Sequence, residues 1–173
     1  MKKVIPLVHL LMLCIFTMAT AQTRLDSIKL YQAALRHMQL AKFVKIVRPT
    51  TNRQLYHNIN LSNPSLNTLD TTNTKFWHNK DWSEFLSKID TSAIKEYTLK
   101  TDRKSWFKTF KQSGSRKIIL SFSPIAFNNR NNKALFVISY QGANSGGAIV
   151  SAFFEKLNST WVIRDVLQLA LLD

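Results

Sequence analysis

The densest group of side chains with binding chemistry lies at residues 100–117, where seven lysines and arginines accompany one acidic residue. Trp106, Phe107 and Phe110 stand among these cations. Cations beside aromatic rings can hold nucleic-acid strands or rest on an anionic membrane surface. A short helix at 105–111 would place the aromatic residues and the lysines on different sides, as in an ordinary helix that covers a sheet. The candidate binding residues of this basic segment are Arg103, Lys104, Lys108 and Lys111.

Three further candidate binding residues lie outside the basic segment. Trp77 follows Phe76 in a polar part of the sequence. Its side chain is either an exposed anchor for a binding partner or an apolar contact that packs against the helix expected after it. Tyr140 ends one expected strand, and Ser145 lies in the glycine-rich turn that leads to the next. If Trp77, Tyr140 and Ser145 converge on a cavity, a small-ligand site becomes the better hypothesis.

The sequence offers no convincing catalytic or metal-binding group. Asn144-Ser145-Gly146-Gly147 is superficially similar to the nucleophile segment of chymotrypsin-like proteases, but Asn144 stands where that family has an aspartate. A serine nucleophile also needs a base and an oxyanion hole, and a tight turn explains the same residues. His78, Asp81 and Glu84 could offer zinc ligands, but the two acids have the spacing of a helix capping pair. We expect no catalytic residue, no metal and no cofactor, and a hydrolase ranks last among the hypotheses.

The N-terminus predicts export. Lys2 and Lys3 precede an uncharged, largely apolar run that ends in Ala19-Thr20-Ala21, and these are the three parts of a secretory signal peptide, cleaved after Ala21. An uncleaved anchor is the alternative, but the apolar part is too short for a spanning helix. Cys14 follows Leu13, where a lipoprotein signal has a small residue. We therefore expect a signal peptide at 1–21, no transmembrane segment after cleavage, and a periplasmic, surface or extracellular location.

The remaining residues, 22–173, have the length of one domain with a single sizeable core. Cys14 is the only cysteine, so the mature chain can form neither a disulfide nor a thiolate metal site. Without Lys2 and Lys3 the formal net charge of +14 becomes about +12. Such an excess favours anionic partners, and for an exported chain these are acidic proteins, glycans or lipid surfaces, not nucleic acid.

The periodicity predicts an α+β domain, with N-terminal helices packed on a C-terminal antiparallel sheet of four to five strands. Apolar residues recur at helical spacing over 24–39 and 81–89, and 42–47 is a possible first strand. Residues 57–75 are polar and predict a long surface connection. From residue 117 the period changes to two, which predicts strands at 117–122, 134–140, 147–154 and 161–168. Short connections between these runs favour antiparallel pairing.

The C-terminal third resembles a group of uncharacterised exported proteins of Bacteroidota-type bacteria. In that group a Ser-x-Pro-x-Phe strand, to which residues 121–127 correspond loosely, precedes an Ala-initiated strand, a glycine-containing turn and a Glu-Lys-x-Asn-x-x-Trp hairpin, here residues 155–161. The group often has cysteines in the glycine turn, and this chain has none there. The resemblance implies export and fold but no activity. The sheet is also similar to the cone-shaped sheet of nuclear-transport-factor-like domains, a likeness of fold alone.

The leading hypothesis is an exported, non-enzymatic binding protein whose basic surface meets an anionic partner. The alternative is a small-ligand protein with a pocket between the helices and the concave face of the sheet. The third hypothesis is a hydrolase. It would need a histidine or a carboxylate as a base near Ser145, and the sequence spacing indicates none.

Overall fold

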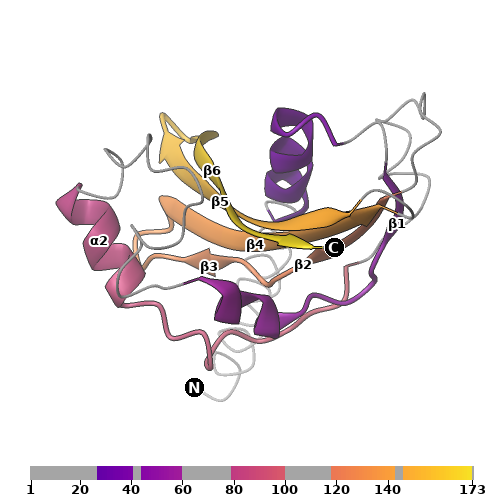
Figure 1. Ribbon diagram of the computed structural model, residues 1–173. Helices are drawn as coiled ribbons and strands as arrows, with labels where there is room; N and C mark the ends of the chain where they lie inside the picture. Colours follow the sequence, from indigo (N-terminus) through magenta and orange to yellow (C-terminus); the bar gives the residue numbers. More distant parts are fainter. Residues whose placement is uncertain (1–26, 41–43, 60–78, 100–117, 143–145, 173) are drawn as a thin grey trace, which may run out of the picture.

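The computed structural model describes residues 27–40, 44–59, 79–99, 118–142 and 146–172 (Figure 1). A helix at 27–37 opens the described part and confirms the helix expected near the N-terminus. It ends in a Schellman motif, in which Leu40 N–H bonds the Leu35 carbonyl and Gln39 N–H bonds the Arg36 carbonyl, both at 3.0 Å. Gln39 takes the left-handed conformation that this ending requires, with φ of 56°.

One six-stranded sheet forms the centre of the molecule. Its strands are β1 (Val44–Val47), β2 (Ile118–Phe122), β3 (Ala126–Phe127), β4 (Lys133–Gly142), β5 (Gly147–Leu157) and β6 (Thr160–Leu172). The order is β1-β2-β4-β5-β6, and β3 pairs with β4. Strands β2 to β6 pair antiparallel, as expected, whereas β1 lies parallel to β2. The α+β class with N-terminal helices is therefore confirmed.

The sheet is covered on both faces (Figure 1). The helix at 27–37 packs on one face, and the 3₁₀ helix η2 (Arg53–Asn58) and the helix α2 (Lys80–Ser87) pack on the other. Every residue from Ala134 to Ile138 is fully buried, because alternate side chains of β4 enter the two cores. The apolar run of β4 therefore reflects burial on both sides.

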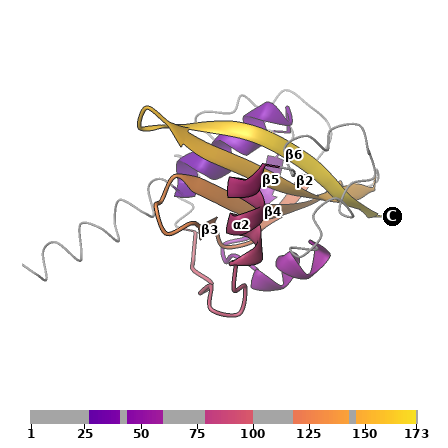
Figure 2. The ribbon, with the colours of Figure 1, turned by 90° about the vertical axis from the view of Figure 1, so that its left-hand side faces the viewer.

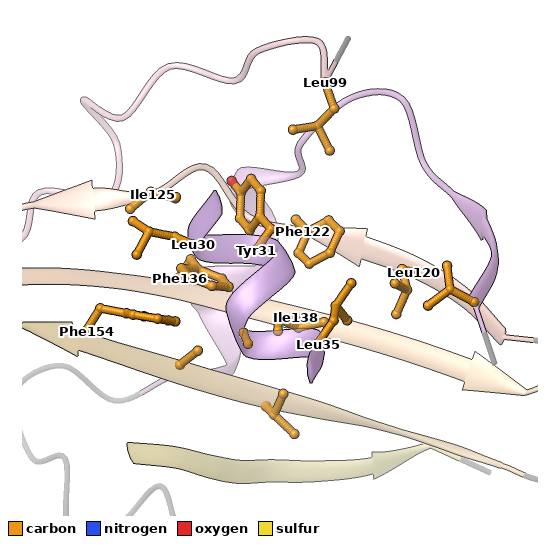
Figure 3. Packing of buried hydrophobic residues seen from close by; sticks show 14 of the residues in the cluster. Leu30, Tyr31, Leu35, Leu99, Leu120, Phe122, Ile125, Phe136, Ile138 and Phe154 are labelled. Carbon is orange, nitrogen blue, oxygen red and sulfur yellow. The ribbon is translucent and has the colours of Figure 1, made fainter. Parts of the chain in front are cut away.

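Aromatic rings fill the core under the helix at 27–37 (Figure 3). The ring of Tyr31 lies 4.4 Å from that of Phe122 and 4.8 Å from that of Phe136, measured between centroids. Phe136 stacks in turn on Phe154 at 5.7 Å. Such rings each bury a large apolar area, so this helix–sheet interface is filled by side chains.

Two buried tyrosines fix the break between β2 and β3, one from each face. Tyr31 donates its hydroxyl to the Ser123 carbonyl at 2.7 Å. The Tyr56 hydroxyl shares its one proton between the Pro124 and Leu135 carbonyls, at 2.7 and 3.0 Å, and accepts the Ala126 N–H at 3.1 Å. These bonds satisfy backbone carbonyl and N–H groups that have no strand partner at the break between β2 and β3, where Pro124 interrupts the hydrogen-bond ladder. They also explain why β3 exists inside the stretch that the sequence predicted as loop.

The start of α2 corrects the predicted capping pair. The N-cap is Asn79, whose side chain accepts the Asp81 N–H at 2.9 Å. Asp81 lies in the first turn, where a negative charge favours the helix dipole. Glu84 pairs instead with Lys88, at 2.5 Å. A true cap precedes the helix, and Asn79 has the short polar side chain that this position prefers.

Candidate functional site

A groove runs between α2 and the turn that joins β3 to β4. Its volume is about 710 Å³, which falls in the range of small-ligand sites. Figure 2 shows α2 crossing in front of this part of the sheet. One side of the groove comes from α2 and the residues after it, and the other from residues 125–133 and Glu155.

Lys133 is the most deeply buried charged residue of the groove. It is the first residue of β4, and its side chain is 7% exposed. Its ammonium lies 5.4 Å from the centre of the Trp82 ring, a cation–π contact. Its nearest carboxylate oxygen is Glu155 Oε1, at 3.4 Å. A buried ammonium is costly unless partners surround it, so these contacts define the electrostatics of the groove floor.

Glu155 is held mainly by another cation. Arg164 approaches Glu155 Oε2 with its Nε at 2.7 Å and with a second nitrogen at 2.6 Å. Burial raises the pKa of Glu155, but the Arg164 guanidinium and then Lys133 outweigh burial and lower its pKa below the usual value. The carboxylate is therefore charged at neutral pH, and Arg164 compensates it at shorter distances than Lys133 does.

The turn before β4 is built by two asparagines. Asn128 Oδ1 accepts the backbone N–H of Asn132 at 2.9 Å and of Lys133 at 3.0 Å, and its amide donates to Asn132 Oδ1 at 2.7 Å. Asn131 has a φ of 51°, which asparagine tolerates better than most residues. This local network fixes the Asn132 amide and the start of β4 at the groove wall. Arg130, exposed in the same turn, also lines the groove.

The opposite wall carries acidic groups on and after α2. The Lys88 ammonium, through a hydrogen bond and its charge, lowers the pKa of Glu84, and Lys80 and Arg130 act in the same direction. Asp90 accepts hydrogen bonds from the Ser92 hydroxyl and from backbone N–H groups of the next turn, which lower its pKa. Asp81 also lines this wall. The groove thus has a donor wall at 130–133 and an acidic wall along α2.

Of the residues predicted from the sequence, only Tyr140 lies in the described part. Tyr140 is half-buried near the end of β4 and packs against the core under the helix at 27–37. The groove lies at the other end of β4, on the opposite face, so Tyr140 takes no part in it. Outside the described residues lie Trp77, Arg103, Lys104, Lys108, Lys111 and Ser145, together with the helix expected at 105–111 and the signal peptide expected at 1–21.

The pairing of Lys133 with Glu155 was not predicted from the sequence, for a structural reason. Lys133 and Glu155 are direct cross-strand partners in the β4–β5 ladder, but they stand far apart in the sequence. Their pairing becomes visible only once the register of the two strands is known. A lysine at the start of a strand and a glutamate near the end of the next were the only signals available.

Within the described ranges no three His, Cys, Asp or Glu side chains gather as metal ligands do. None of the helices in those ranges is long and apolar enough to cross a membrane. No protein-family model matches the chain, and neither a curated protein nor a solved structure does so. The chemistry of the groove therefore rests on its own residues: donors at 130–133, charged groups on and after α2, and a few apolar side chains.

Proposed function

We propose that the protein is an exported binding protein without catalytic activity, and that its basic segment, residues 100–117, contacts an anionic partner. The observation that carries the proposal is charge: a formal net charge of +14, with seven basic residues in this one segment. Such an excess attracts polyanions and speeds their association. The segment contains the candidate binding residues Arg103, Lys104, Lys108 and Lys111.

The fixed neighbours of the basic segment support a surface role. Leu99 is 3% exposed, and its N–H bonds the Pro49 carbonyl at 2.6 Å. Ile118 is buried and pairs with β1 on one side and β4 on the other. The residues on either side of the segment are therefore fixed on the β1–β2 side of the sheet.

The packing of the two cores favours this proposal over a ligand pocket beneath the helices. Tyr31 and its aromatic neighbours occupy the space under the helix at 27–37. On the other face, Trp82 contacts the ring of Phe153 at 5.8 Å between centroids. A small molecule at either place would have to displace closely packed side chains, which costs several kcal/mol.

The proposal is tested by binding of the mature chain, residues 22–173, to heparin and to vesicles with and without anionic lipid. We expect binding at low salt that weakens steeply towards physiological ionic strength, where charges are screened beyond about 8 Å. Replacing Arg103, Lys104, Lys108 and Lys111 by glutamine is expected to lower the affinity for the polyanion at least about tenfold.

The matched control replaces four exposed cations elsewhere, Lys29, Arg48, Lys80 and Lys95, by glutamine. This control removes the same formal charge and is expected to lower the affinity for the polyanion much less. Equal losses in the two variants would show that only net charge matters, and the basic segment would then have no special role. Affinity that does not depend on salt, or no affinity for any polyanion, contradicts the proposal as a whole.

A further inference from the structure

The Lys133 ammonium has unused hydrogen-bonding capacity inside the groove. An ammonium carries three N–H donors, and among the described residues its only polar partner is Glu155, at 3.4 Å. The Trp82 ring covers one side of the ammonium without accepting a conventional hydrogen bond. Since Glu155 is compensated at shorter range by Arg164, Lys133 retains an incompletely matched positive charge in a buried position.

Two further donors of the turn before β4 line the same groove. The Asn132 amide uses its oxygen to accept from Asn128, and its nitrogen makes no hydrogen bond within the described part of the chain. The Arg130 guanidinium, two positions earlier, makes no ion pair there either. Lys133, Asn132 and Arg130 all line the groove. An anionic group entering at this wall would therefore meet three donors in close succession along the chain.

The other walls restrict which anion fits. Phe85, Ile89 and Phe127 supply apolar surface, which suits a ligand with an apolar body. Across the groove stand Asp81, Asp90 and the Glu84–Lys88 ion pair. The excess of acidic groups on this wall disfavours a dianion because like charges repel at short range. A single negative charge matches Lys133, the buried cation of the groove, which shares its carboxylate partner Glu155 with Arg164.

We propose that this groove binds a carboxylate attached to an apolar body, with Lys133 as the main anchor and Asn132 and Arg130 as supporting donors. The site is separate from the basic segment and does not depend on its role. A peptide C-terminus that ends in an apolar residue and a medium-chain fatty acid share this chemistry. Binding replaces water at the donor wall with carboxylate oxygens, and charge-assisted hydrogen bonds of this kind are the strong ones.

The experiment measures binding of the mature chain by isothermal titration calorimetry with four ligands. Octanoate and an acetylated Ala-Ala-Leu peptide with a free carboxylate are the positive arms. The same peptide as its C-terminal amide and octyl phosphate, near its dianionic form above neutral pH, are the negative arms. We expect at least one carboxylate to bind, and the amide and the phosphate to bind at least about tenfold more weakly, since each loses or mismatches a charged hydrogen bond.

Lys133→Met keeps the aliphatic packing on Trp82 and removes the ammonium, and it is expected to lower the carboxylate affinity at least about tenfold. Lys156→Met is the matched control, because Lys156 also lies over a tryptophan, Trp161, at 5.5 Å but outside the groove. We expect Lys156→Met to leave the affinity unchanged. Unchanged affinity in Lys133→Met overturns the proposal.

A second variant keeps the test decisive if Lys133→Met does not fold. Arg130 is exposed, so Arg130→Gln leaves the core intact and is expected to weaken carboxylate binding about threefold. No binding of either carboxylate by the unmodified chain also overturns the proposal. The basic-segment variant is expected to bind carboxylates normally, so this site and the polyanion proposal can fail independently.

Discussion

At the scale of single residues, the three hydrogen bonds of the Tyr56 hydroxyl are the most concentrated polar interaction in the described core. Burial raises the pKa of Tyr56, so the hydroxyl stays protonated throughout the neutral range. Tyr56→Phe would leave the Pro124 and Leu135 carbonyls and the Ala126 N–H without this partner. We expect a loss of about 2–4 kcal/mol in the free energy of unfolding, measured by urea denaturation.

Tyr140→Phe is the control for that loss, because the half-buried Tyr140 hydroxyl makes no hydrogen bond within the described part of the chain. We expect it to change the free energy of unfolding by less than about 0.5 kcal/mol. Similar losses in both variants would mean that the Tyr56 hydrogen bonds contribute little.

The roles of single residues were the hardest feature to predict from the sequence. Asp81 and Glu84 have the spacing of a capping pair, yet a better cap, Asn79, stands two residues earlier. Spacing identifies pairs within one helix turn, but it cannot rank two adjacent candidates for the cap. The Lys133–Glu155 pair could be predicted only with knowledge of the strand register, and this register depends on the whole sheet.

At the scale of elements, the start of α2 depends on Asn79. Asn79→Ala removes the oxygen that accepts the Asp81 N–H and is expected to lower the free energy of unfolding by about 1 kcal/mol. Asp81→Ala removes only a favourable charge near the helix start and is expected to cost about 0.5 kcal/mol. Chemical denaturation monitored by circular dichroism measures both. A larger loss for Asp81→Ala would restore the capping role to Asp81.

The elements themselves were largely predictable. Four of the six strands fall on the expected runs, and β1 falls within the run expected at 42–47. Only β3, two residues long, was missed, because so short a strand has no measurable period. The double-sided burial of β4 was also not foreseen. A continuous apolar run such as 134–138 is compatible with burial on either one or two faces until the second covering helix is placed.

At the scale of the whole molecule, the described chain is stabilised by two apolar cores on one sheet. Cys14 is the only cysteine of the sequence, so no intrachain disulfide contributes. A double-sided core buries much more apolar surface than a sheet covered on one face, and this burial is the main favourable term in folding. The architecture is therefore stabilised by apolar packing without covalent crosslinks.

Export is itself testable on the whole chain. We expect the secreted or periplasmic protein to begin at Gln22, as determined by intact mass and N-terminal sequencing after expression in a Gram-negative host, because Ala19-Thr20-Ala21 fits a signal peptidase site. Replacing Ala21 by a bulky residue such as phenylalanine is the comparison and should leave the precursor uncleaved. Recovery of the intact chain from the cytosol with Met1 in place would contradict the export hypothesis.

The parallel pairing of β1 with β2 also has a consequence for the order of folding. Strands β4, β5 and β6 follow one another along the chain and meet through short connections. In contrast, Val44 meets Ile118 only after the intervening residues, including η2 and α2, have been gathered into one large loop. Closing such a loop costs entropy before any contact offsets it, and contacts distant in sequence slow folding. We therefore expect the C-terminal hairpins to form the folding nucleus and β1 to join the sheet late.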